Sequence, residues 1–254
     1  MVDIHSHILP GMDDGAEDLE KAVAMVKLAA AAGTTDIVAT PHANPEYDWD
    51  PDVVARKASE LFEASGGVLR IHTGCDFHLT LENISDALAN PDKYTINHKC
   101  YLLVELSDRL VPNTTDEVFG RMLTAGIVPV VTHPERNRRL YRRLDRIEKW
   151  VALGVRIQIT ADSLSGRFGE TARSVATELM ERGLVHFLAS DGHGTRDRRP
   201  VLDEGRANLA SAYGESYAEL LCTENPRATL DGAPVSGARP EPRLKRKWYV
   251  FWRR

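Results

Sequence analysis

Cysteine is scarce in this sequence of 254 residues, and the few that occur are poorly placed for chemistry. Cys75, Cys100 and Cys222 are odd in number and widely scattered, which argues against a disulfide framework and fits a reducing cytosol. A cysteine phosphatase needs an arginine six residues after its thiolate, in a loop whose backbone amides hold phosphate. The residues six positions after the three cysteines are Leu81, Leu106 and Ala228. The sequence therefore excludes that mechanism.

Long apolar runs, an excess of positive charge and glycine-rich nucleotide motifs are also missing. No apolar run approaches the ~18 residues of a membrane span, and the chain does not open with a basic, apolar secretory leader. The 32 lysines and arginines are outnumbered by 37 aspartates and glutamates, which argues against a dedicated nucleic-acid binder. Neither Gly-x4-Gly-Lys-Ser/Thr nor Gly-x-Gly-x-x-Gly occurs, so nucleotide binding of those kinds is not indicated. We therefore expect a cytoplasmic protein that binds no nucleic acid.

Short apolar or β-branched runs alternate with segments of helical period along most of the chain. Several runs are apolar throughout, as parallel strands buried on both faces are. The seven predicted strands span residues 2–5, 36–40, 68–73, 101–106, 127–132, 155–160 and 185–189. The predicted helices between them include residues 19–30, 53–64, 117–125, 147–153 and 171–182. Repeated β-α units predict a parallel sheet, and seven units in about 230 residues favour a distorted (β/α)7 barrel in a single α/β domain.

The last part of the chain has a different composition. Residues 231–242 are rich in glycine, proline and alanine, and we expect them to be loosely ordered. Residues 239–254 carry seven basic residues against one acid, interleaved with four aromatic residues. Such a segment suits peripheral contact with an anionic membrane or an acidic partner, and it suits equally a strand or short helix docked on the barrel. The predicted division is a barrel over residues 1–230 and a linker with a basic, aromatic tail over residues 231–254.

Histidines and aspartates occur where five of the seven predicted strands end. His5 and His7 are two residues apart, and side chains at this spacing in an extended chain point to the same side. The others follow the second, third, fifth and seventh strands: His42, Asp76, His133, Asp191 and His193. A lone histidine at a strand end is more often structural, but five such places are hard to obtain by accident. Because active sites of β/α barrels lie where the carboxyl ends of the strands meet, we predict that these side chains lie together.

Imidazole and carboxylate groups are ligands of zinc, manganese and iron. About eight of them are too many for one tetrahedral ion, so the pattern predicts two or three divalent metal ions with a bridging carboxylate such as Asp76. Paired ions suit the hydrolysis of phosphate esters, because they generate hydroxide near neutral pH and hold both the attacking and the leaving oxygen. The sequence thus predicts a metal-dependent phosphoesterase.

Four motifs surround these residues. They are Asp-Ile-His-Ser-His-Ile-Leu-Pro-Gly at 3–11 with Asp-Asp-Gly at 13–15, Ala-Thr-Pro-His at 39–42, Thr-His-Pro-Glu-Arg at 132–136 and Ser-Asp-Gly-His at 190–193. With these motifs, residues 2 to about 230 resemble the polymerase-and-histidinol-phosphatase (PHP) superfamily. Within it they resemble the manganese-dependent protein-tyrosine phosphatases of bacterial capsule and exopolysaccharide operons, the CpsB/YwqE type. The resemblance implies a distorted (β/α)7 barrel with a three-metal site that holds manganese, with iron and zinc as alternatives.

The resemblance also implies a set of metal ligands. They are His5, His7, Asp14, His42, Asp76, His133, Asp191 and His193. Asp76 stands where the bridging carboxylate is usually a glutamate, and its side chain is one methylene shorter. Asp13 stays an alternative to Asp14 as the ligand from the first loop.

Two arginines are the implied phosphate-binding residues, because a guanidinium group donates paired hydrogen bonds to phosphate oxygens. Arg136 lies three residues after His133, and Arg198 lies five residues after His193. Together with Asp76, they are the predicted catalytic residues. A tyrosine phenolate has a pKa near 10, so its departure needs no strong general acid. Glu105 and Glu135 lie near the predicted site, with structural roles at least as well supported as acid catalysis. The alternatives to Arg198 are its neighbours Arg196 and Arg199.

The resemblance implies a phosphotyrosine protein as substrate, an autophosphorylated tyrosine kinase of polysaccharide export. Three alternatives stay open. A small-molecule phosphatase of the same superfamily, such as histidinol-phosphate phosphatase, would use the same ligands. An amidohydrolase-like barrel also begins with His-x-His but commonly needs a bridging lysine, and no lysine follows a predicted strand here. A non-catalytic metal-binding interaction module would be a degenerate barrel, against which the full ligand set argues.

Overall fold

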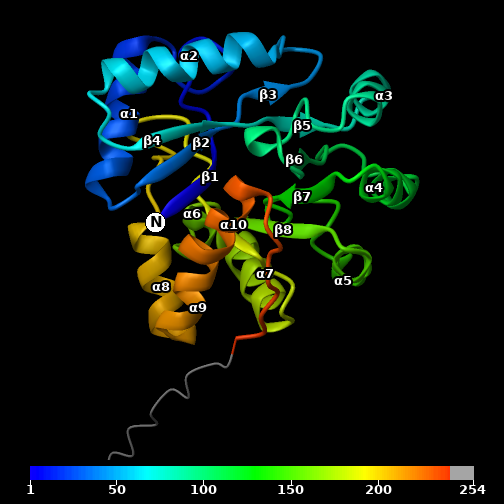
Figure 1. Ribbon diagram of the computed structural model, residues 1–254. Helices are drawn as coiled ribbons and strands as arrows, with labels where there is room; N and C mark the ends of the chain where they lie inside the picture. Colours follow the sequence, from blue (N-terminus) through cyan, green and yellow to red (C-terminus); the bar gives the residue numbers. More distant parts are fainter. Residues whose placement is uncertain (241–254) are drawn as a thin grey trace, which may run out of the picture.

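The computed structural model describes residues 1–240, and its strands form two parallel sheets (Figure 1). In the first sheet, β1 (Val2–Ser6) pairs with β2 (Asp36–Ala39), and β2 pairs with β4 (Arg70–Thr73). The second sheet contains six strands in the order β3-β5-β6-β7-β8-β9. Their bounds are β3 His42–Ala43, β5 Asp76–His78, β6 Tyr101–Glu105, β7 Val128–Thr132, β8 Arg156–Thr160 and β9 Phe187–Ala189.

The two sheets are continuous through the chain at one end and hydrogen-bonded at the other. The chain passes from β2 to β3 through Thr40 and Pro41, and the amide of Asp76 on β5 donates to the Pro41 carbonyl at 3.1 Å. On the other side, the amide of His7 donates to the carbonyl of Gly192, and the amide of Asp191 donates to the carbonyl of His5, both at 2.9 Å. The segment after β9 is therefore held against the end of β1, and residues far apart in sequence meet there.

Helices surround the strands (Figure 1). In chain order they are α1 Leu19–Ala31, α2 Pro51–Ala64, α3 Leu81–Ala89, α4 Thr115–Thr124, α5 Leu144–Leu153, α6 Ala161–Leu164, α7 Glu170–Glu181, α8 Asp203–Tyr213, α9 Glu215–Glu219 and α10 Asn225–Asp231. A 3₁₀ turn, Ile96–His98, precedes β6, and a π-helical turn, Leu220–Glu224, precedes α10. Helix starts follow local chemistry: the side chain of Asp50 accepts the amides of Asp52 and Val53 ahead of α2, whose first residue is Pro51. No helix of residues 1–240 has both the length and the apolar character needed to cross a membrane.

Most strands are buried on both faces, which explains their apolar sequences; β4 is the exception, with Arg70 exposed. On β6, Leu103 belongs to an inner cluster with Ile4, Val38 and Phe187, which lie on three other strands. Its neighbours Leu102 and Val104 face a second, outer cluster. The helices α4 and α5 contribute aromatic side chains, Phe119 and Trp150, to this outer cluster. This alternation follows the period of two of an extended chain. The polar residues at the strand ends are consequently held by a rigid scaffold.

Several sequence predictions need correction. The strand predicted over 68–73 begins at Arg70, and a second short strand, β5, follows after Gly74 and Cys75. The strand predicted over 185–189 is limited to β9, and the helices α3, α6, α8, α9 and α10 were not predicted.

The described part of the predicted loose segment is packed against the rest of the chain. Val235 is only 6% exposed and belongs to the inner cluster. The side chain of Asn225 donates to the Ser236 carbonyl at 2.8 Å and accepts the Ser236 amide at 3.1 Å. Tyr101 donates its hydroxyl to the Ala233 carbonyl at 2.8 Å. Composition misled the prediction, because side chains distant in sequence satisfy this backbone. Most of the predicted tail, residues 241–254, lies outside the described residues.

Candidate metal centre

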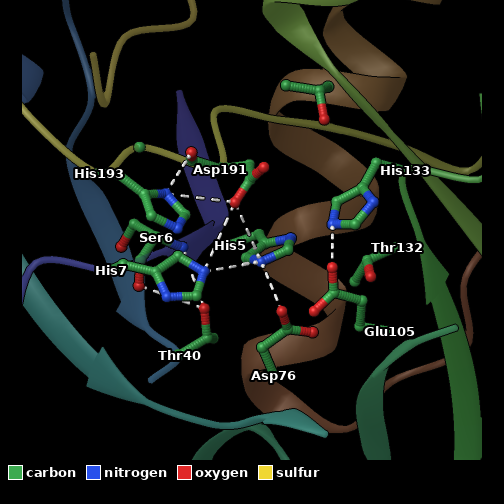
Figure 2. Close-up of polar contacts among 12 residues, drawn as sticks. His5, Ser6, His7, Thr40, Asp76, Glu105, Thr132, His133, Asp191 and His193 are labelled. Carbon is green, nitrogen blue, oxygen red and sulfur yellow. Dashed lines mark hydrogen bonds and ion pairs between the residues drawn. The ribbon is translucent and has the colours of Figure 1, made fainter. Parts of the chain in front are cut away.

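The polar side chains at the strand ends converge on one place (Figure 2). His5 on β1 and His7 just after it point to the same side, and their Nε2 atoms lie 3.2 Å apart. His42 begins β3 and Asp76 begins β5. His133 follows β7, and the loop after β9 supplies Asp191 and His193. The i, i+2 spacing of His5 and His7 produces the shared direction that the sequence predicted.

Fixed partners orient three of the histidines. The Nδ1 atom of His5 lies 3.0 Å from Oε1 of Gln158 on β8, and that of His7 lies 2.6 Å from Oδ2 of Asp13. The Nδ1 atom of His193 lies 2.9 Å from the carbonyl oxygen of Asp191. Because each of these acceptors requires the proton on Nδ1, the Nε2 lone pair of each ring is left for a cation.

The two aspartates of the first loop have different positions. Asp13 is buried and accepts hydrogen bonds from His7 and from the backbone amide of His42. Asp14 lies with Oδ1 3.3 Å from Nε2 of His193 and 3.5 Å from Nε2 of His42. Gly15 allows this arrangement, because a Cβ there would lie 2.0 Å from the carbonyl oxygen of His7. The geometry favours Asp14 as the donor to a cation and Asp13 as the group that orients His7.

Asp191 is buried at the middle of the cluster. Its Oδ1 atom lies 3.5 Å from Nε2 of both His5 and His7, while its Oδ2 atom accepts hydrogen bonds from Arg136 and, at 2.6 Å, from Arg198. The backbone at Asp191 is left-handed, with a φ of 52°, which non-glycine residues adopt rarely. Such a conformation persists only where the surroundings fix it, here through the hydrogen bond of its amide to β1.

Asp76 and Glu105 are two further carboxylates that face the histidines. The Oδ2 atom of Asp76 lies 3.2 Å from Nδ1 of His42 and 3.5 Å from Nε2 of His5. Glu105, at the end of β6, has Oε1 3.6 Å from Nε2 of His133 and Oε2 2.6 Å from Nε2 of His78. Glu105 therefore connects β5 and β7 across the strand that lies between them.

Ten residues make up the candidate metal centre. They fall into four overlapping groups, and within each group the donor atoms lie within 4.8 Å of one another. The groups are His7, Asp14, His42 and His193; His42, Asp76, His78 and Glu105; His5, His7 and Asp76; and His5, His133 and Asp191. All eight residues that the sequence suggested as ligands are among the ten. Sequence reasoning did not assign His78 and Glu105 as ligands. Glu105 ends a strand like the others, and counting glutamate with histidine and aspartate would have found it.

Several atoms of the candidate metal centre suit a cation better than a hydrogen bond. Both carboxylate oxygens of Asp76, Nδ1 of His42 and Nε2 of His78 are buried without a hydrogen-bond partner. They nevertheless lie 2.6–3.6 Å from other donor atoms of the group. A buried polar atom without a hydrogen-bond partner lowers the free energy of unfolding by about 1–3 kcal/mol unless a ligand satisfies it. Nitrogen and carboxylate donors at these distances fit manganese, iron or zinc.

The electrostatics also favour cations. Burial lowers the pKa of His7 and His42, but the adjacent carboxylates outweigh it and raise these pKa values to about 9 and about 11. Burial acts in the opposite direction on Asp76 and Asp191, yet the surrounding imidazoles hold the pKa of each carboxyl well below its usual range. Burial and nearby Arg136 lower the pKa of His133 to about 4, which keeps that ring neutral. The carboxylates are thus ionised and attract positive charge strongly.

The structure distinguishes among the arginines of the predicted phosphate site. Arg136 and Arg198 both reach Asp191. The guanidinium of Arg136 also lies over the ring of Phe168, with its carbon 4.1 Å from the ring centre. Arg196 and Arg199 line a pocket together with Arg198, but of these three arginines only Arg198 is paired with Asp191 in the described part of the chain.

Glu135 has a structural position. It is fully buried, and its Oε1 accepts the Thr160 amide at 2.9 Å and the Ser163 hydroxyl at 2.7 Å. Burial raises the pKa of its carboxyl. Glu135 therefore ties the loop after β7 to the end of β8.

Comparison with known proteins places the chain in a family. Residues 1–231 match the family model of capsular polysaccharide synthesis, CpsB/CapC. The chain is 33% identical to CapC of Staphylococcus aureus, over 98% of this chain and 99% of the relative. It is 32% identical to the tyrosine-protein phosphatase YwqE of Bacillus subtilis strain 168, over 99% of this chain and 100% of the relative. A solved structure superimposes with a TM-score of 0.88 and 32% identity, covering 95% of this chain and 99% of the other. It comes from work on YwqE and on CpsB from Streptococcus pneumoniae, described as unique metal-dependent tyrosine phosphatases. The chain therefore belongs to the CpsB/CapC family of capsular polysaccharide synthesis.

Proposed function

We propose that this chain is a metal-dependent protein-tyrosine phosphatase that acts on a bacterial tyrosine kinase of polysaccharide export. The observation that carries the proposal is the buried cluster of imidazoles and carboxylates beside Arg136 and Arg198. The strand pairings, together with the link from β9 back to β1, support a distorted seven-stranded barrel with this cluster at its carboxyl end. The names of the family relatives support tyrosine phosphatase activity.

The proposed cofactor is two or three divalent ions, with manganese first and iron or zinc as alternatives. Ten donor residues exceed the coordination of one ion, so their four overlapping groups support two or three. The group with Asp14 shares His42 with the group that contains Glu105, and the two groups that contain His5 bring in Asp76 and Asp191. Bound divalent ions supply a strong nucleophile near neutral pH and neutralise the charge on phosphoryl oxygens.

The protein's own residues position the phosphate. Arg136 is held by the ring of Phe168, so its planar guanidinium is already oriented before substrate arrives. Arg198 approaches the same Asp191 oxygen from the loop after β9. Two guanidiniums at one edge of the cluster can donate paired hydrogen bonds to a phosphate dianion. The tyrosine leaving group has a pKa near 10, so the position of Glu135 away from the cluster does not hinder the reaction.

We expect Arg136→Lys to lower kcat/KM for a phosphotyrosine peptide by about 10–100-fold, because a charge-assisted hydrogen bond contributes ~1.5–3 kcal/mol. Lysine keeps the charge but loses the planar pair of donors and the stacking on Phe168. Steady-state kinetics would measure the loss. Arg199→Lys is the matched control from the neighbouring pocket, and it should keep near wild-type kinetics. A loss in the Arg199 variant alone would move the phosphate site to that pocket.

The experiment that tests the proposed function compares substrates. Protein stripped with a chelator and reloaded with Mn²⁺ should hydrolyse a phosphotyrosine peptide with a kcat/KM at least about tenfold above that for histidinol phosphate. Parallel reloading with Fe²⁺ and Zn²⁺ identifies the preferred ion. Preference for histidinol phosphate would select the small-molecule alternative, and metal binding without any hydrolysis would select the interaction module. Contact of residues 239–254 with an anionic membrane, which falls mostly outside the described residues, stays a prediction.

A further inference from the structure

A groove of about 600 Å³ lies between two loops that follow neighbouring strands. One wall is the turn after β5 and the start of α3, with Leu79, Leu81 and Ile84. The opposite wall is the loop from β6 to α4 together with the first turn of α4, with Leu110 in the loop and Val118 on the helix. We call it the α3–α4 groove. Loops at this end of parallel strands usually carry substrate specificity, because the scaffold beneath them is rigid.

Large apolar side chains on both walls of the α3–α4 groove are exposed to solvent. Leu81 is 81% exposed and Leu110 is 65% exposed, more than any other large apolar residue in the described chain. Single exposed leucines are common on soluble proteins and need no explanation. Two of them on facing sides of one groove indicate a binding surface.

The floor of the α3–α4 groove is continuous with the candidate metal centre. His78 and Glu105 line the groove and also belong to the cluster. Glu105 reaches His133 at 3.6 Å on one side and His78 at 2.6 Å on the other. A second pocket shares His78 and Glu105 with the groove and is also lined by Arg136, so a chain lying in the groove leads toward the place where the phosphoryl group would bind.

We propose that the α3–α4 groove binds an apolar side chain next to phosphotyrosine in the substrate peptide, which deepens the proposed function and rests on it. A phosphorylated tyrosine at the metal centre brings the neighbouring residues of its own chain to the groove. A second copy of the protein seated there would cover His78 and Glu105 and block the centre. Burial of one leucine side chain contributes ~1.5–3 kcal/mol, enough to set a preference of tenfold or more among peptides.

The test uses three phosphates with the metal-loaded protein. They are 4-nitrophenyl phosphate and two phosphotyrosine peptides of equal length and charge, one with leucine and one with alanine on both sides of the phosphotyrosine. We expect the leucine peptide to have a kcat/KM about tenfold above that of the alanine peptide. Leu110→Ser and Leu81→Ser should each reduce this ratio to threefold or less, with hydrolysis of 4-nitrophenyl phosphate within twofold of wild type.

Leu153→Ser is the matched control, because Leu153 is 56% exposed at the end of α5 and does not line the groove. It should retain the full preference. Equal kcat/KM for both peptides in the wild type, or an undiminished preference in both groove variants, would overturn the groove proposal while leaving the phosphatase proposal intact. If the loaded wild type hydrolyses none of the three phosphates, both proposals fail.

Discussion

Asp191→Asn is expected to lower kcat/KM for 4-nitrophenyl phosphate by about 10³-fold or more. Asparagine keeps the size of the side chain but removes the charge that faces the Nε2 atoms of His5 and His7 at 3.5 Å. The same substitution leaves Arg136 and Arg198 without the carboxylate that they share. Losing one preorganised electrostatic group from an active site commonly costs 10²–10³-fold, and Asp191 serves both the ions and the arginines.

The measurement combines kinetics with metal analysis of the purified variant. We expect less bound metal in Asp191→Asn than in the wild type, because a neutral amide is a weaker ligand than a carboxylate. Asp197→Asn is the matched control, since Asp197 is exposed in the same loop. Full metal content together with more than a tenth of wild-type activity in Asp191→Asn would contradict its proposed role.

The sequence predicted the fold best where chemistry is local and periodic. Short apolar or β-branched runs marked the strands, because successive side chains face the inner and outer clusters alternately and both clusters are apolar. The break between β4 and β5 was missed, because it arises at Gly74, whose added Cβ would meet Val38 and Thr40 at 3.1–3.2 Å. The packing of residues 232–240 was missed for a related reason, since Asn225 and Tyr101 satisfy that backbone from distant positions.

The candidate metal centre was predictable from the rule that strand ends meet, and its details were not. The choice between Asp13 and Asp14 depends on which carboxylate accepts the His7 Nδ1 proton, which spacing along the chain does not reveal. Glu105 was seen but not assigned, because glutamate was left out of the strand-end count. His78 was missed because it follows Asp76 on a strand too short to recognise.

Chelation is expected to abolish phosphatase activity and to lower the melting temperature of the intact chain. The candidate metal centre gathers four carboxylates into one largely buried region, where the surrounding imidazoles and two arginines, Arg136 and Arg198, face them. Like charges in a buried region repel strongly, and bound cations remove that repulsion. An ion present at 100 times its dissociation constant stabilises the folded state by about 2.7 kcal/mol. In a domain of this size each kcal/mol shifts the melting temperature by about 2–4 °C.

We therefore expect a decrease of ~5–10 °C for each ion removed, and recovery of both stability and activity when Mn²⁺ is returned. Thermal unfolding before chelation, after it and after reloading, with metal content measured each time, tests this expectation. Asp191→Asn serves as the control, because Mn²⁺ should raise its melting temperature less than that of the wild type. An unchanged melting temperature and undiminished turnover in protein shown to hold no metal would contradict both the metal centre and the phosphatase mechanism. Loss of activity with an unchanged melting temperature would separate the two, because the ions would then serve the reaction without stabilising the fold.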